Sequence, residues 1–392
     1  MVAGVPVPGK IVRGPVTWYA YLVLGFFTFA LNIQGNILPF LRADLGLSYR
    51  VVSLHSSAVA AGMIIVGLFG DLAIRRIGRR AALSVGSAAV VLGGIVLSQG
   101  SVAWVTIASC GLIGAVGALV PATVFALLAD IHGKNRDAAY AEANAVCYAF
   151  AILAPLSMGL FLSLGLGWRS AVIFGMVLGG AIALYYSRTP VPEARRVAGR
   201  KGGVLPPAYW AYWAALGLGC AVEFCVLLWA PSFLEQVGGL SKPWAATFAA
   251  AFALAMLVGR TAGSALVRHY STHQLFIAAI VVALGGFALY WTLGSTFLVV
   301  PGLFVVGLGV ALFYPLLLGL AVGAAGELGD LASARTMLAV GIAVLTMPAL
   351  LGTLADEVGL RAAHLMLPVL VLLVLGCFLV AQALERRALQ PA

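Results

Sequence analysis

Glu223 is the residue whose type and place most directly suggest chemistry. It stands alone in the apolar run Leu216–Trp229, far from any loop. Lost hydration opposes ionisation of a carboxyl group in such surroundings, so the group would bind a proton or pair with a cation. A structural carboxyl, hydrogen-bonded to a neighbouring helix, is the alternative. We predict that Glu223 binds a proton or a substrate.

A second polar group interrupts the first apolar run. Asn32, Gln34 and Asn36 follow one another there, and Asn32 and Asn36 share a helix face because they are four residues apart. Amides of this kind also join helices to one another, which is the alternative. We predict that they belong to a substrate site at the depth of Glu223.

Arg260 is the third candidate, in Leu257–Gly263. It could bind an anionic substrate, serve a gate, or extend its charge to the membrane surface. Counting about 1.5 Å per residue places Glu223 and Arg260 roughly 10–15 Å apart in depth, so a direct salt bridge is not expected. Tyr148 and Tyr314 are candidates to line the same site, with ordinary helix packing as the alternative.

Composition identifies the elements that must position these residues. The chain is 62% hydrophobic and only 9% charged, against about 25% charged in soluble domains. Apolar stretches of about 20 residues recur, each long enough to cross roughly 30 Å of hydrocarbon. The class is therefore a helical membrane protein. The five cysteines all lie in apolar runs, and their spacing suggests no metal site. No cofactor is predicted.

We read twelve spans in the sequence, in two groups of six. A segment rich in proline, glycine and arginine, 188–206, separates residues 1–187 from residues 207–392. We predict two six-helix bundles joined by this linker. The spans are 18–40, 51–73, 81–99, 102–129, 138–163, 168–187, 207–232, 243–267, 274–293, 296–325, 331–353 and 362–384.

Charge predicts the orientation. If both termini are cytoplasmic, the outer loops hold only five of the 23 Lys and Arg residues, and Arg260 lies within a span. The remaining 17 lie on the cytoplasmic side, as the positive-inside rule requires.

The sequence also repeats at an offset of 192–194 residues. Matched pairs include Gly46-Leu47-Ser48 with Gly239-Leu240-Ser241, and Pro121 with Pro315. Such a repeat is typical of transporters built from two related halves.

The loop between the second and third spans carries a family resemblance. Gly67-x-x-x-Asp71 and Arg76-Ile77-Gly78-Arg79-Arg80 resemble the motif at this place in the major facilitator superfamily, although Arg75 stands where the family has an acid. The resemblance implies an all-α fold of twelve helices and a cytoplasmic gate. Its candidate residues are Asp71, Arg76, Arg79, Arg80, Asp130 and Glu142, with ordinary interfacial charges as the alternative. Ala154-Pro155-Leu-Ser-Met158-Gly159 is similar to the end of the family's antiporter motif.

These features together predict a secondary transporter of the inner membrane. We expect a monomer that moves a small organic solute by alternating access, with protons as the coupling ion, and that does not bind nucleic acid. A uniporter or a drug efflux antiporter is the alternative within transporters. A membrane enzyme or scaffold is the alternative outside them, but the sequence shows no cluster of acid, base, nucleophile or metal ligands.

Overall fold

The computed structural model describes residues 13–133, 136–193, 203–267, 269–292 and 296–389. Within these ranges the regular structure is helical, and twelve helical stretches are long and apolar enough to cross a membrane. The prediction of a twelve-span helical membrane protein is therefore confirmed. The exact boundaries of the two bundles stay a prediction.

In the described ranges, the helical elements before the linker are α1 (Pro15–Leu45), α2 (Tyr49–Ile77), α3 (Arg79–Gln99), α4 (Ala103–Leu112), the π-helix η1 (Ile113–Gly117), α5 (Leu119–His132), α6 (Arg136–Ser163) and α7 (Gly167–Tyr185). Those after it are α8 (Pro207–Gln236), α9 (Lys242–Phe248), α10 (Ala250–Leu266), α11 (Thr272–Thr292), α12 (Thr296–Val310), α13 (Phe313–Ala324), the 3₁₀ turn η3 (Gly326–Leu328), α14 (Gly329–Val358), α15 (Leu360–Ala363) and α16 (Met366–Leu389). We call elements α1–α7 the first half and elements α8–α16 the second half.

Corresponding turns of the two halves have the same geometry. Gly46 and Gly239 both adopt positive φ, at 62° and 69°, where a side chain would be strained. Ser48 and Ser241 then occupy the N-cap positions of α2 and α9 with nearly equal extended torsions. These residues are partners in the sequence repeat, so the repeat extends to backbone conformation.

Corresponding spans also break at corresponding places. The fourth span contains the π-helix that ends at Gly117, four residues before Pro121. The tenth span breaks between Val310 and Phe313, and Ala311 is four residues before Pro315. A proline removes one helical hydrogen bond and its ring clashes with the carbonyl four residues earlier, which explains both interruptions.

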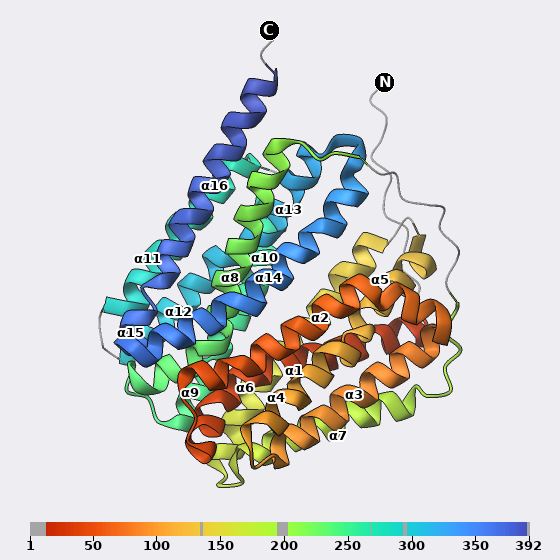
Figure 1. Ribbon diagram of the computed structural model, residues 1–392, viewed down its shortest axis with the longest axis vertical. Coiled ribbons are helices and arrows are strands. Elements are labelled where there is room, and N and C mark those ends of the chain that lie inside the picture. The colour runs from red at the N-terminus through yellow and green to blue at the C-terminus, as the bar shows by residue number, and fades with distance from the viewer. Residues whose placement is uncertain (1–12, 134–135, 194–202, 268, 293–295, 390–392) are drawn as a thin grey trace.

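The two halves meet at one end and diverge toward the other (Figure 1). We call the end with the 188–193 segment and the α2–α3 turn the linker face, and the end with the Gly46–Ser48 turn the far face. Hydrogen bonds between the halves lie toward the far face: Tyr49 and Arg50 donate to Asp356, and Ser57 donates to the Leu345 carbonyl. The structure therefore holds the far face closed.

Gly35 permits a close crossing of the two halves. A Cβ atom there would lie 2.5 Å from the Leu227 carbonyl oxygen of α8, inside the contact limit. The two helices therefore touch backbone to backbone, about two-thirds of the way along each. Gly35 and Leu227 are also 192 residues apart, so the crossing joins repeat-related positions.

Candidate functional site

Glu223 and Arg260 form an ion pair. Nη2 of Arg260 lies 3.4 Å from both carboxylate oxygens of Glu223. The Glu223 side chain is 21% exposed and the Arg260 side chain is 30% exposed, so solvent reaches this pair although both residues lie within membrane spans. The expectation that Glu223 and Arg260 do not form a direct salt bridge is therefore wrong.

Side-chain direction explains the pairing. Cα–Cβ bonds lean toward the N-terminus of their own helix, and α8 and α10 belong to consecutive spans that run in opposite directions. Glu223 therefore leans toward the linker face and Arg260 toward the far face. Counting residues along each span ignores this lean and the length of the arginine side chain, and so overestimates the gap.

Both halves contribute to the surroundings of the pair. The guanidinium carbon of Arg260 lies 5.3 Å from the ring centre of Tyr148, which belongs to α6 in the first half. Tyr314 of α13 and Cys220 of α8 also interact electrostatically with Arg260. The Arg260 guanidinium is thus surrounded by Glu223, Tyr148, Tyr314 and Cys220, at the boundary between the halves. Tyr148 and Tyr314 are two of the predicted site residues.

Arg260 uses little of its hydrogen-bonding capacity. Its hydrogen bonds to Glu223 are long, at 3.4 Å, whereas charge-assisted N–H···O bonds are ordinarily about 2.7–2.9 Å, and it also interacts with the Tyr148 side chain. Its Nε atom is buried and has no hydrogen-bond partner among the described residues. A guanidinium carries five N–H donors, so this one remains able to bind another acceptor.

The amides of α1 make no hydrogen bond to Glu223 or Arg260 in the described structure. Asn32 donates to the Thr28 carbonyl at 2.9 Å, and Asn36 donates to the Asn32 carbonyl at 3.2 Å. Nδ2 of each amide thus bonds its own helix. The Nε2 atom of Gln34 and the Oδ1 atom of Asn36 are buried without a partner among the described residues. Their part in a substrate site stays a prediction.

The predicted gate residues lie at the linker face, and the contacts described for Arg79, Arg80 and Asp130 join parts of the first half and the linker. Nη2 of Arg79 lies 2.6 Å from Asp130, and the buried Arg79 guanidinium also donates to the carbonyl oxygens of Pro192 and Glu193. Arg80 donates to the carbonyl of Ser187. These contacts exist while the halves diverge at this face, so they do not require its closure.

Glu142 differs from the expected arrangement. It pairs with Arg13 at 2.7 Å instead of with the arginines of the 75–80 loop, because Arg13 precedes α1 and α1 packs along α6. This hydrogen bond raises the pKa of the Arg13 guanidinium above its ordinary value. Arg76 is exposed. Asp71 lies within α2, but its side chain is outside the described part of the structure.

The far-face contact was not predicted from sequence. The two carboxylate oxygens of Asp356 accept from the backbone N–H groups of Tyr49 and Arg50, each at 2.7 Å. The Tyr49 hydroxyl donates to Gln236, and its ring lies edge-on to Trp229 at 5.6 Å. An acid at the end of the eleventh span and a serine-capped start of the second were visible in the sequence, but nothing there pairs them.

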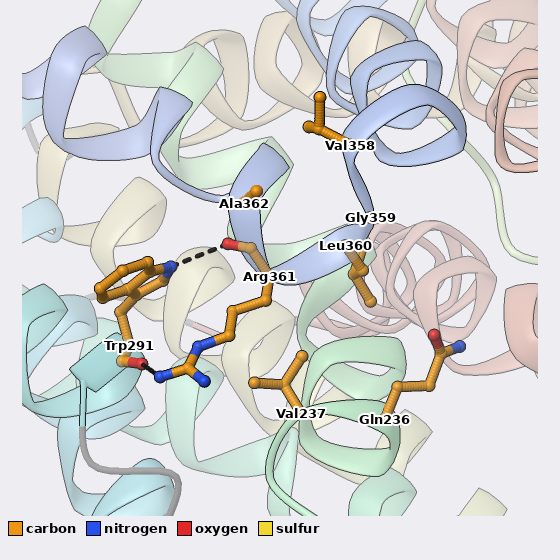
Figure 2. A pocket seen from close by; sticks show the side chains of 8 residues that line it. All are labelled: Gln236, Val237, Trp291, Val358, Gly359, Leu360, Arg361 and Ala362. Carbon is orange, nitrogen blue, oxygen red and sulfur yellow. Dashed lines mark hydrogen bonds between the residues drawn. The ribbon is translucent and has the colours of Figure 1, made fainter.

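A shallow pocket of about 550 Å³ adjoins this contact at the far face. Figure 2 shows its lining, where Trp291 donates to the Arg361 carbonyl at 2.8 Å and Arg361 donates back to the Trp291 carbonyl at 3.4 Å. The pocket opens outward at the ends of α8 and α14. Its lining residue Gln236 is 13 residues along α8 from Glu223, or about 20 Å at 1.5 Å per residue, so we do not assign the pocket to the candidate site.

His55 was also missed, since it is a single histidine in an apolar span. Its two ring nitrogens lie 2.8 Å from the Val52 carbonyl and from the Thr106 hydroxyl of α4. Both nitrogens are satisfied, so His55 joins α2 to α4. Among the described residues no group of histidine, cysteine, aspartate and glutamate is arranged to hold a metal ion.

Comparison with known proteins decides the family. The model of the Major Facilitator Superfamily matches residues 20–339. The chain belongs to the Major Facilitator Superfamily. A search of curated proteins found no match.

Solved structures share the fold at low identity. A bacterial homologue of the human lysosomal transporter Spinster, inward-facing and occupied, has a TM-score of 0.79 at 14% identity, covering 97% of this chain and 100% of that one. The nucleoside transporter NupG has a TM-score of 0.79 at 12% identity, with 93% and 99% covered. A D-xylose–proton symporter has a TM-score of 0.73 at 15% identity, with 94% and 96% covered.

Proposed function

We propose that this chain is a secondary active transporter that moves a small organic solute by alternating access, coupled to protons. We place it in the inner membrane as a monomer, with both termini cytoplasmic. The observation that carries the proposal is the Glu223–Arg260 pair, set at the boundary of the halves with Tyr148 of the first half over the cation.

The surroundings of the pair support a transport role over a structural one. A pair kept only for stability would have short, fully satisfied contacts, since its hydrogen bonds must offset the cost of burying two charges. Here the contacts are 3.4 Å long and one guanidinium N–H has no partner. The pair is also partly exposed in a conformation whose halves diverge at one face, as alternating access requires.

Comparison supports coupling by analogy alone. A D-xylose–proton symporter and a peptide transporter are among the structures with the same fold. The antiporter alternative rests on Pro155 and Gly159. Gly159 packs closely against Pro243 and Thr247 of the second half, so helix packing accounts for it.

Glu223→Gln tests the proposal. The amide keeps the shape of the side chain and can still accept a hydrogen bond from Arg260, but it cannot titrate. In vesicles we expect the variant to exchange solute across the membrane and to lose accumulation driven by a pH gradient. Asp44→Asn is the matched control, because this acid lies at the end of α1 and pairs with Arg169. Accumulation with wild-type pH dependence in Glu223→Gln would assign the proton to another group.

A further inference from the structure

We infer that the substrate is a small organic monoanion, whose carboxylate takes the place of Glu223 on Arg260 as Glu223 takes up one proton. The inference rests on the proposed function and specifies its substrate class and stoichiometry. It follows from the charges at the site, the slack in the ion pair, and the apolar character of the surrounding spans.

Charge balance comes first. The empty site holds one carboxylate and one guanidinium and is neutral. A proton arriving with an uncharged solute would leave Arg260 as a cation within the membrane spans without a counter-ion, which is unfavourable. An anion arriving without a proton would leave two negative charges on one cation. A proton and a monoanion arriving together keep the site neutral, since protonated Glu223 releases Arg260 to the incoming carboxylate.

The groups that face Glu223 allow this exchange. Arg260 from α10 is the basic group beside it, and the other groups that interact with it are Cys220 on its own helix, Tyr148 from α6 and Tyr314 from α13. None of these three carries a charge at neutral pH. The proton balance of the site therefore belongs to Glu223, and its charge balance to Glu223 and Arg260.

Geometry supports a carboxylate as the ligand of Arg260. Glu223 engages a single guanidinium nitrogen at 3.4 Å, while Nε has no partner. The planar guanidinium matches a carboxylate with two parallel N–H···O bonds, which Glu223 does not achieve in this conformation. The carboxylate of a free solute can approach in the plane of the Arg260 guanidinium, which the Glu223 carboxylate, fixed to α8, does not reach. The Tyr148 ring beside the cation then borders the organic part of the solute.

Matched acids and amides test the inference in purified, membrane-reconstituted protein. The probes are acetate, lactate and benzoate beside acetamide, lactamide and benzamide, which have nearly the same shape without the charge. Calorimetry in two buffers of different ionisation enthalpy counts the protons taken up on binding. We expect at least one acid to bind and its amide not to bind, with one proton taken up for each anion.

Two variants separate the roles of the pair. In the wild type, Kd for the anion should rise tenfold for each pH unit once Glu223 is ionised in the empty protein, because one proton is linked to binding. Glu223→Gln should bind the anion at least as tightly, with no proton uptake and no dependence on pH. Arg260→Gln should lose anion binding, and size-exclusion chromatography checks that both variants remain folded.

The inference is overturned if an amide binds as well as its acid, if no acid binds, or if the anion binds without a proton. Transport current supplies a further check. Loading of one proton and one monoanion carries no net charge, so uptake should not respond to an imposed membrane voltage. An uncharged solute accumulated with a proton would overturn this inference and leave the proposed proton coupling standing.

Discussion

The Glu223–Arg260 pair joins two helices that run in opposite directions through the protein. Glu223 and Arg260 are recognisable because a charge in an apolar span needs a reason. Their mutual distance is not, because it depends on the direction of side chains on two antiparallel helices. The two side chains tilt toward each other because each Cα–Cβ bond leans toward the N-terminus of its own helix. Counting residues along a span does not include this tilt.

Tyr148 provides a prediction at this scale. Its ring lies over the Arg260 guanidinium, and cation–π contacts contribute about 0.5–2 kcal/mol according to how far they are desolvated. Tyr148→Ala should therefore weaken solute binding by about twofold to thirtyfold, measured as Kd by calorimetry. Tyr148→Phe keeps the ring and should retain most of the affinity. Equal losses in the two variants would show that the hydroxyl, and not the ring, is what matters.

The sequence predicts where the helical spans lie but not where a span is interrupted. The fourth and tenth spans read as continuous apolar runs, yet each breaks four residues before its proline, at Gly117 and at Ala311. The prolines and their repeat relation are visible in the sequence. Whether a proline kinks a helix or interrupts it depends on which neighbouring groups bond the carbonyl that the proline leaves free. Those groups come from other helices and cannot be identified from the sequence.

Asp356 provides a prediction for a pair of elements. Its carboxylate accepts from the first N–H groups of α2, where a helix favours negative charge. It thus joins the end of α14 to the start of α2 and holds the far face closed. Asp356→Asn removes the charge and one acceptor, and should shift the balance toward an open far face by about 1–2 kcal/mol, or about fivefold to thirtyfold.

Hydrogen exchange measures this shift at the atoms involved. In Asp356→Asn one of the two backbone N–H groups, of Tyr49 or Arg50, loses its acceptor and the other keeps only a neutral one, so a peptide covering residues 46–57 should exchange faster. Glu357→Gln is the matched control, since Glu357 is an exposed acid one position along the same helix. Unchanged protection in Asp356→Asn, or equal loss in both variants, would contradict a role for Asp356 in closing the far face.

The whole molecule reflects the sequence repeat. Gly46 and Gly239 are 193 residues apart, and Gly35 and Leu227, which meet at the crossing of α1 and α8, are 192 residues apart. Sequence therefore predicts which positions correspond across the halves. It does not predict how far the halves diverge at each face, because that depends on the balance between two conformations that contain the same helices.

Orientation in the membrane is the prediction that belongs to the whole molecule. The sequence places 17 of 23 Lys and Arg residues on the side of the 188–206 linker, so we expect that side to be cytoplasmic. Val204 in the linker is 93% exposed, and Ser241 at the far face is exposed too. In intact cells, a membrane-impermeant thiol reagent should label Ser241→Cys and leave Val204→Cys unlabelled until the membrane is permeabilised. Unmodified protein gives the background of the five native cysteines, three of which are buried. Labelling of Val204→Cys in intact cells would show that the orientation is the opposite one. The far face that Asp356 holds closed would then be the cytoplasmic face.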